Sequence, residues 1–152
     1  MRKLILAAVL TLAGLAAAQT AAAPAKLTIV DTEVTVPAGP GKAPWAAVGF
    51  VSEIRVPLEA TDAAGAPVAN VEITWSVQNS GKAPVYVVAA RDGGTRKVVT
   101  ITVEPGKTAT LKTTTGPDGK TWIMLNANQV AQAKIAATSG NLRALNLRDV
   151  AH

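Results

Sequence analysis

Apolar and polar residues alternate along two runs near the middle of the chain. Residues 53–60 read EIRVPLEA and residues 71–77 read VEITWSV, so every second residue of each run is apolar. Between them lies DAAGAP, residues 62–67, which is rich in turn-forming residues. A period of two, with one polar and one apolar face, is typical of a half-buried strand. The pattern therefore predicts two strands joined through this turn.

The same signals recur along the chain and predict further short strands. We expect strands at residues 26–36, 85–89, 97–103, 107–113, 121–127, 133–138 and 142–150. Turns containing Gly or Pro separate them, including RDGGTR at residues 91–96 and GPDG at residues 116–119. About seven to nine strands at this spacing predict an all-β fold, either an antiparallel sandwich or a barrel.

The first expected strand changes parity within its length. Leu27 and Ile29 are apolar at odd positions, whereas Val34 and Val36 are apolar at even positions. Because a one-residue slip turns every side chain to the other face, a bulge or a break near residues 31–32 would reconcile the two halves.

Three further features make specific predictions. Pro57 cannot donate a ladder hydrogen bond, so it should lie on an edge or at a bulge. Residues 122–125 (WIML) are apolar without interruption, which predicts a central strand with both faces covered. In the last strand Leu145 and Leu147 alternate with polar residues, which predicts an apolar face at the odd positions.

The N-terminus has the pattern of a secretory signal peptide. Arg2 and Lys3 precede an apolar run at residues 4–15, and Ala16–Ala18 offer a small-residue cleavage site. Ala23 or Ala25 could serve as cleavage sites as well, and an uncleaved anchor helix is the less favoured alternative. We therefore expect a signal peptide at residues 1–18, a flexible leader at 19–25 and a single domain at 26–152, located in the periplasm or at the cell surface.

Composition and charge exclude some classes of function. The chain has no Cys, so an exported domain must be stable without disulfides. Without Arg2 and Lys3, 13 basic residues face 10 acidic ones, a net charge of +3. Because the basic residues are scattered, nucleic-acid binding is not expected, and no membrane span is expected in the mature chain. A mature chain of about 130 residues is long enough for one sizeable core.

A family resemblance rests on three segments. Residues 60–77 read ATDAAGAPVANVEITWSV, residues 115–122 read TGPDGKTW, and residues 133–138 read AKIAAT. In these segments the chain resembles bacterial immunoglobulin-like domains of the invasin and intimin type, which implies an Ig-like β-sandwich. Transthyretin-like and carboxypeptidase-regulatory-like sandwiches use a similar G-x-P-V-x-x-V turn. Residues 81–106 are longer than the family's usual connection and suggest an additional hairpin.

The physical chemistry of the motif also favours a structural role. Asp62 can accept hydrogen bonds from backbone amides across its turn, Gly65 allows a positive φ, and Pro67 fixes the return into the next strand. Trp75 then fills the space between two sheets.

Residues capable of catalysis are scarce. His152 is the only histidine, so neither a Ser-His-Asp nor a Cys-His set can be assembled. Among the carboxylates, Asp31, Glu33, Asp62 and Asp118 do not have the spacing of a calcium loop. The sequence therefore predicts neither an enzyme, nor a metal site, nor a cofactor.

Two surface features are candidates for binding a partner. Trp45 and Phe50 lie in or beside a Pro- and Gly-rich loop at residues 37–49, where Trp45 either binds a partner or folds back over the core. Arg91, Arg96 and Lys97 flank a glycine turn and either bind an anionic surface or form a solvated hairpin tip.

These observations leave three functions open. The first is an exported, non-catalytic Ig-like domain that serves the cell envelope as a structural or adhesion/protein-interaction module. The second is a periplasmic or secreted accessory domain that binds a polysaccharide or small ligand with Trp45. The third is a subunit of a surface assembly such as a pilus or S-layer, which would associate through an unpaired strand edge.

Overall fold

The computed structural model describes residues 22–30, 33–35, 52–127 and 132–149 of the chain. These residues form strands and connections, and no helix occurs among them. The strands are β1 (Lys26–Ile29), β2 (Glu33–Thr35), β3 (Ser52–Thr61), β4 (Glu72–Asn79), β5 (Val85–Asp92), β6 (Thr95–Val103), β7 (Thr108–Thr114), β8 (Lys120–Ala127), β9 (Gln132–Ser139) and β10 (Leu142–Asp149). The prediction of an all-β fold is confirmed, and β1 and β2 are the two parts of the first expected strand.

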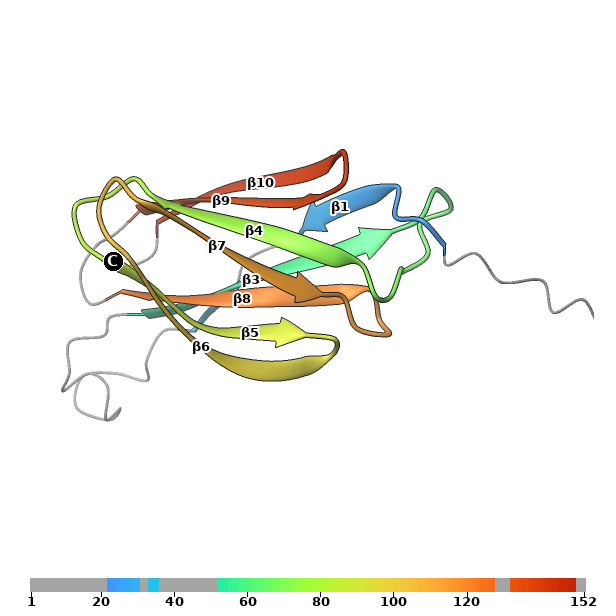
Figure 1. Ribbon diagram of the computed structural model, residues 1–152, viewed down its shortest axis with the longest axis horizontal. Helices are drawn as coiled ribbons and strands as arrows, with labels where there is room; N and C mark the ends of the chain where they lie inside the picture. Colours follow the sequence, from blue (N-terminus) through green and yellow to red (C-terminus); the bar gives the residue numbers. More distant parts are fainter. Residues whose placement is uncertain (1–21, 31–32, 36–51, 128–131, 150–152) are drawn as a thin grey trace, which may run out of the picture.

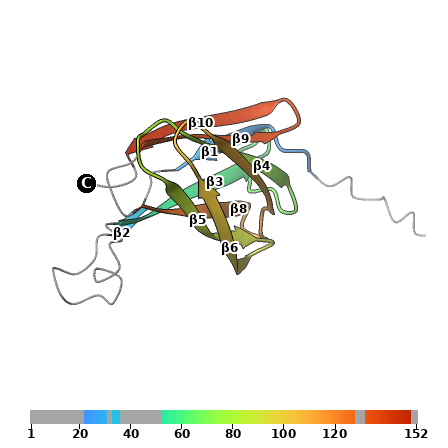
Figure 2. The ribbon, with the colours of Figure 1, turned by 60° about the vertical axis from the view of Figure 1, so that its left-hand side comes forward.

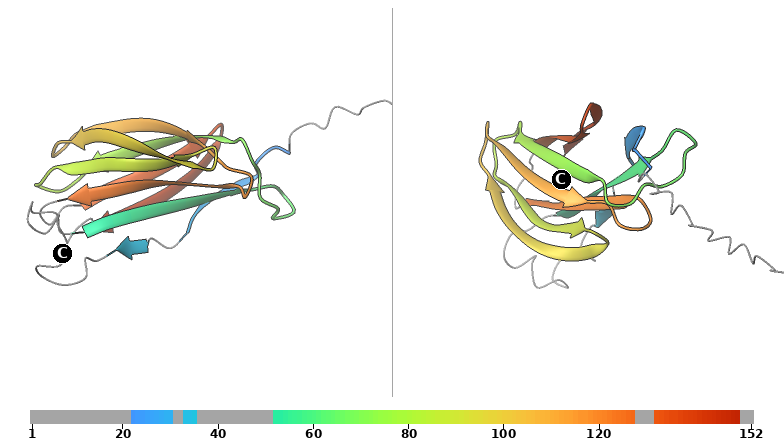
Figure 3. Two further views of the ribbon diagram at one scale, coloured as in Figure 1. Left: turned by 90° about the horizontal axis from the view of Figure 1, so that it is seen from below. Right: turned by 45° about the vertical axis from the view of Figure 1, so that its right-hand side comes forward.

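The strands form two antiparallel sheets that pack face to face as a β-sandwich (Figures 1 and 2). The larger sheet has the order β1-β3-β8-β5-β6, with β2 also paired to β3, and the smaller sheet has the order β10-β9-β4-β7. At one margin of the sandwich β1 lies against β10, and at the other margin β6 continues through a short turn into β7 (Figure 3). The hairpin expected within residues 81–106 is confirmed as β5 and β6.

The predicted break in the first strand is confirmed. Ile29 pairs with Leu58, whereas Glu33 pairs with Arg55, so the N-terminal segment has one more residue than β3 over this interval. Pro57 lies in the same interval, and its carbonyl accepts a hydrogen bond of 2.9 Å from the Val30 N–H. The missing N–H of proline is therefore tolerated here, because the ladder is already interrupted.

The core lies between the sheets and follows the predicted alternation. Trp75 is fully buried at its centre, with Leu58 and Ile123 contributed by the opposite sheet. A buried Asn79 closes one end of the core: its Nδ2 donates to the carbonyls of Ala83 (2.7 Å) and Val103 (2.8 Å). Because both bonds are made in a buried place, Asn79 joins three segments without leaving its amide donors unsatisfied.

The predicted central position of β8 is confirmed, but the prediction that both its faces are covered holds only in part, because Trp122 is partly exposed on the outer face. The prediction for β10 is wrong. β8 is the central strand of the larger sheet, and its buried residues include both Ile123 and Met124 from opposite faces. In β10, however, Ala144 is buried and Leu145 is 66% exposed. The short turn between β9 and β10 fixes a register in which Ala144 pairs with the buried Ala137, and this register overrides the hydrophobicity of Leu145.

The two turns of the sequence motif pack against each other. Asp62 Oδ1 accepts hydrogen bonds of 2.9 Å from the amides of Ala64 and Ala66, as expected. The Ala60 N–H donates to the Gly119 carbonyl (2.9 Å), which joins the first turn to the second. Gly119 has a φ of 71°, and a Cβ there would lie 2.7 Å from the Cβ of Pro67. Only glycine fits at this contact.

Several predictions lie outside the described residues, namely the signal peptide, the first three residues of the leader (19–21), and the loop with Trp45 and Phe50. The described part of the chain holds no helix of the length and apolar character that crossing a membrane requires.

Candidate functional site

The outer face of the larger sheet carries an aromatic residue at its centre. Along β8 the side chains of Thr121 and Ile123 point into the sandwich, so Trp122 between them points outward. Its neighbours in register are Pro57 on β3 and Arg91 on β5. Trp122 is therefore flanked by a rigid apolar ring on one side and by a guanidinium on the other.

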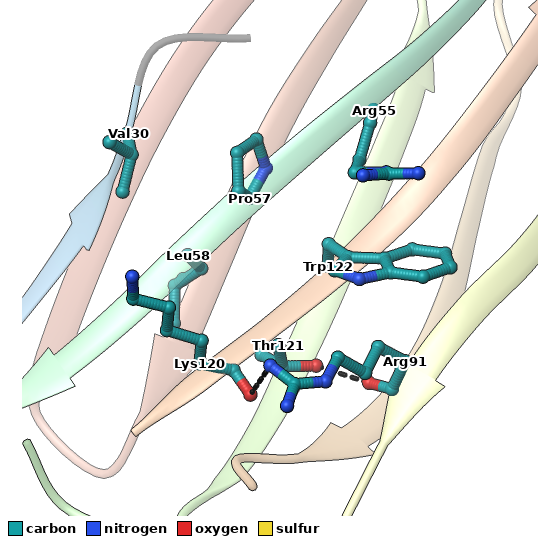
Figure 4. A pocket seen from close by; sticks show the side chains of 8 residues that line it. All are labelled: Val30, Arg55, Pro57, Leu58, Arg91, Lys120, Thr121 and Trp122. Atoms are coloured by element: carbon teal, nitrogen blue, oxygen red, sulfur yellow. Dashed lines mark hydrogen bonds between the residues drawn. The ribbon is translucent and has the colours of Figure 1, made fainter. Parts of the chain in front are cut away.

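A second arginine stacks on the same indole. The guanidinium carbon of Arg55 lies 4.9 Å from the centroid of the Trp122 ring, which is within the range of a cation–π interaction. Figure 4 shows Arg55 and Arg91 on opposite sides of Trp122. The pairing of β3 and β5 with β8 positions both arginines, although they are far apart in sequence.

Beside Trp122 lies an open recess of about 240 Å³. Its walls are partly apolar, its rim is basic, and it is lined by Val30, Arg55, Pro57, Leu58, Arg91, Lys120, Thr121 and Trp122 (Figure 4). Because the lining comes from β3, β5, β8 and the residue after β1, the shape of the recess depends on the pairing of the whole sheet. The combination of an indole, a proline and three basic side chains suits a ligand that has an apolar part and an anionic group.

Arg91 is held in place by an ion pair at the rim. Its Nη1 donates to both carboxylate oxygens of Asp118, at 3.1 and 2.8 Å, and Asp118 also accepts from the Lys120 N–H. Burial acts to raise the pKa of Asp118, but the hydrogen bonds from Arg91 and Lys120 outweigh it and hold this pKa below its usual value. Arg91 is thus oriented toward the recess, with its charge partly compensated.

The predicted cluster of Arg91, Arg96 and Lys97 is divided between the two faces of the β5–β6 hairpin, with Arg91 and Arg96 on one face and Lys97 on the other. Arg91 and Arg96 are paired across the β5–β6 hairpin, and only Arg91 lines the recess. Lys97 instead donates to the Asp92 carboxylate. This hydrogen bond, together with one from the Thr114 N–H (2.8 Å), holds the pKa of Asp92 below its usual value despite the effect of burial. The three residues therefore do not form one anion-binding patch.

The second predicted pair cannot be placed, because Trp45 and Phe50 lie outside the described residues. Trp122 and Arg55 were missed as site residues. The available signal was parity: in a strand whose odd residues face the core, an aromatic residue at position 122 must lie on the outer face.

A second hollow of about 360 Å³ lies on the outer face of the smaller sheet. It is lined by Ser76, Gln78, Lys134, Ile135, Ala136, Arg143 and Leu145. Its lining contains no aromatic residue, and most of its members are flexible or small side chains. We therefore take the recess beside Trp122 as the candidate site.

The described residues include no group of three His, Cys, Asp or Glu side chains that could hold a metal ion. Comparisons with protein-family models, with curated proteins and with solved structures found no match to this chain.

Proposed function

We propose that this protein is an exported, non-catalytic Ig-like domain that serves the cell envelope as an interaction module. The recess beside Trp122 is the observation that carries this proposal. The apolar run at residues 4–15 supports export, and the sequence of residues 60–77, 115–122 and 133–138 supports the resemblance to domains of the invasin and intimin type.

The residues at the recess are of the kinds that anchor protein partners. Trp and Arg are enriched among the residues that contribute most to binding energy, and they cluster in well-packed pockets. Here a single Trp122 is flanked by Arg55 and Arg91 on a rigid sheet, so little conformational entropy is lost on binding.

The size of the recess favours a macromolecular partner over a small molecule. Small-molecule sites usually enclose roughly 300–1,000 Å³, and this recess is both smaller, at about 240 Å³, and open. It can accept one side chain or one sugar ring. We therefore propose that it binds a projecting anionic group of a larger partner, either a protein or an envelope polysaccharide.

Site-specific photocrosslinking in the native cell tests this proposal. A photoreactive residue in place of Lys120, at the rim, should trap a partner, whereas the same residue in place of Ala64, at an exposed turn, should not. Trp122→Ala in the Lys120 variant should reduce the adduct at least about tenfold. The same adducts from positions 120 and 64, or adducts unaffected by Trp122→Ala, would contradict the proposal.

Binding of a polysaccharide has a separate readout. Because Trp122 provides the aromatic surface, its fluorescence should change when acidic wall glycans are added, and the difference spectrum should vanish in Trp122→Phe. A glycan response that persists in Trp122→Phe would place the sugar elsewhere.

A further inference from the structure

The two margins of the sandwich differ in how well they cover the core. Four apolar side chains at the β6–β7 margin pack against the core but remain only partly buried, namely Val99, Ile101, Ala109 and Leu111, against two at the β1–β10 margin, namely Ile29 and Leu142. At the opposite margin β1 and β10 lie against each other. Figure 3 shows β6 and β7, in yellow and orange, away from the red and blue strands. The sandwich is therefore open along β6 and β7.

Along this margin the backbone of β7 also pairs with no second described strand. Among the described strands, β7 pairs with β4 only. At its two ends the Asn79 N–H donates to the Lys107 carbonyl and the Thr115 N–H donates to the Val71 carbonyl, so the odd residues are those that bond to β4. The backbone groups of the even residues Thr108, Thr110, Lys112 and Thr114 consequently point outward.

One of these outward positions already has partners. The Thr114 N–H donates to Asp92 Oδ1 (2.8 Å), and the Thr114 carbonyl accepts from the Gly93 N–H (2.8 Å). The outward groups of Thr108, Thr110 and Lys112 have no partner among the described residues. They form a short, regular row of donors and acceptors. Beside this row lie the partly buried apolar side chains of Val99, Ile101, Ala109 and Leu111, which we call the apolar seam.

The neighbouring edge is less suited to pairing. The register of β6 with β5 shifts between Val98 and Ile101, and such a bulge interrupts an edge. β7 keeps one register with β4 over its whole length and contains no proline. β7 is thus the edge at this margin that can accept another strand.

We propose that β7 pairs antiparallel with β7 of a second copy of this chain. With Thr110 opposite its own symmetry mate, Thr108 lies opposite Lys112, and Ala109 lies opposite Leu111 on the core-facing side. The uncharged, β-branched Thr110 suits a two-fold axis, because Thr–Thr pairs stabilise a sheet whereas like charges destabilise it. Each Lys112 lies away from the axis and is compensated by Glu72 at 2.7 Å.

This self-complementarity favours a second copy over a strand of another protein. The outward N–H of each Thr110 meets the outward carbonyl of the other Thr110, and each Leu111 covers the partly buried apolar side chains of its partner. The two four-stranded sheets then become one continuous sheet. The seam is at a strand edge, away from the recess beside Trp122, so the dimer does not depend on the proposed function.

The test is the oligomeric state of the mature chain, measured by analytical ultracentrifugation over a concentration series. We expect a dimer whose dissociation constant rises at least about tenfold in Thr110→Lys and in Thr110→Pro. Thr110→Pro removes only the outward N–H, so pairing with β4 is retained, and circular dichroism verifies the fold. The control is Thr28→Lys on β1, at the opposite margin, which should leave the dimer intact.

A single cysteine gives a second readout, because the chain contains no Cys of its own. Mild oxidation of Thr110→Cys should give a disulfide-linked dimer, whereas Thr28→Cys should stay monomeric. A monomer at all concentrations without crosslinking at position 110, or a dimer unchanged by Thr110→Lys, would overturn the proposal. Capture of a different polypeptide at position 110 would overturn it in favour of strand addition by that protein. Trp122→Ala should not alter the dimer.

Discussion

The indole N–H of Trp75 donates a hydrogen bond of 2.8 Å to Oγ1 of Thr113, on the neighbouring strand. Thr113 Oγ1 lies 2.8 Å from Thr121 Oγ1, which in turn bonds to the Arg91 carbonyl. The indole can only donate and the carbonyl can only accept, and each hydroxyl has one proton. The protons must therefore run in one direction, from Trp75 through Thr113 and Thr121 to Arg91, which connects the smaller sheet to the rim of the recess.

Removal of the Trp75 side chain should be the most costly of the substitutions considered. Trp75→Ala should lower the free energy of unfolding by about 3–5 kcal/mol, because it leaves a large cavity between the sheets. Trp75→Phe should cost less, since it keeps much of the ring but loses the N–H. Urea unfolding followed by circular dichroism measures both. Equal costs for the two variants would contradict the role of the aromatic ring in filling the space between the sheets.

Thr113→Val tests the chain of hydrogen bonds. Valine has nearly the same shape, so packing is retained while the Trp75 N–H and the Thr121 hydroxyl each lose a partner. We expect a loss of about 1–3 kcal/mol. Thr110→Val is a matched control on the exposed face of the same strand and should change stability by less than about 0.5 kcal/mol. If the two variants were equally stable, the hydrogen bonds of Thr113 would contribute nothing to the stability of the protein.

Gly119→Ala should be far more destabilising than the same change at Gly65. Both glycines have a positive φ, which costs about 1–2 kcal/mol for alanine. A Cβ at Gly65 meets nothing within 4 Å, whereas one at Gly119 lies 2.7 Å from Pro67 Cβ and 2.9 Å from the Ala60 carbonyl oxygen. Thermal unfolding of both variants measures the difference. A smaller loss for Gly119→Ala than for Gly65→Ala is the result that would contradict the packing of the two turns.

Asp62→Ala should cost about 1 kcal/mol, because its exposed carboxylate supports two backbone amides of the turn. Partner capture at the recess should be unchanged, which separates this turn from the site. Chemical denaturation and the photocrosslinking assay are the two measurements. Loss of capture in a folded Asp62→Ala protein would implicate the turn in binding.

Acid should destabilise the protein through Asp92 and Asp118. The pKa of each is below the usual 3.8, so both contribute stability above that pH and lose it as the pH falls through their lowered values. Asp92→Asn and Asp118→Asn should each reduce stability at pH 7 and flatten the decline below about pH 4. Unfolding curves at pH 7, 4 and 2.5 test this. In a double variant that carries both substitutions, the free energy of unfolding should fall less steeply with decreasing pH than in the unsubstituted protein. If it fell just as steeply, the acid sensitivity would belong to other groups.

Features set by neighbouring residues were predictable from the sequence. The turn of Asp62 and Gly65, the parity change between Leu27 and Val34, and the burial of Trp75 all follow from spacing over a few positions. The position of Pro57 followed as well, because its lack of an N–H leaves few places in a sheet.

Features set by the pairing of distant strands were not predictable from the sequence. Leu145 alternates as expected, but its face is decided by the turn that places Ala144 opposite Ala137. The recess was missed for the same reason, since Arg55 reaches Trp122 only through the pairing of β3 with β8. No local pattern encodes that neighbourhood.

The contact between Gly119 and Pro67 also bears on how this domain varies through evolution. Two turns about fifty residues apart interlock so tightly that position 119 has no room for a side chain. The pair of turns, D-x-x-G-x-P and D-G, is then a better fingerprint for recognising distant homologues than overall identity. The glycine should be retained even where the proline is replaced, because the Ala60 carbonyl oxygen and the Val68 nitrogen also lie 2.9 Å from a Cβ at this position.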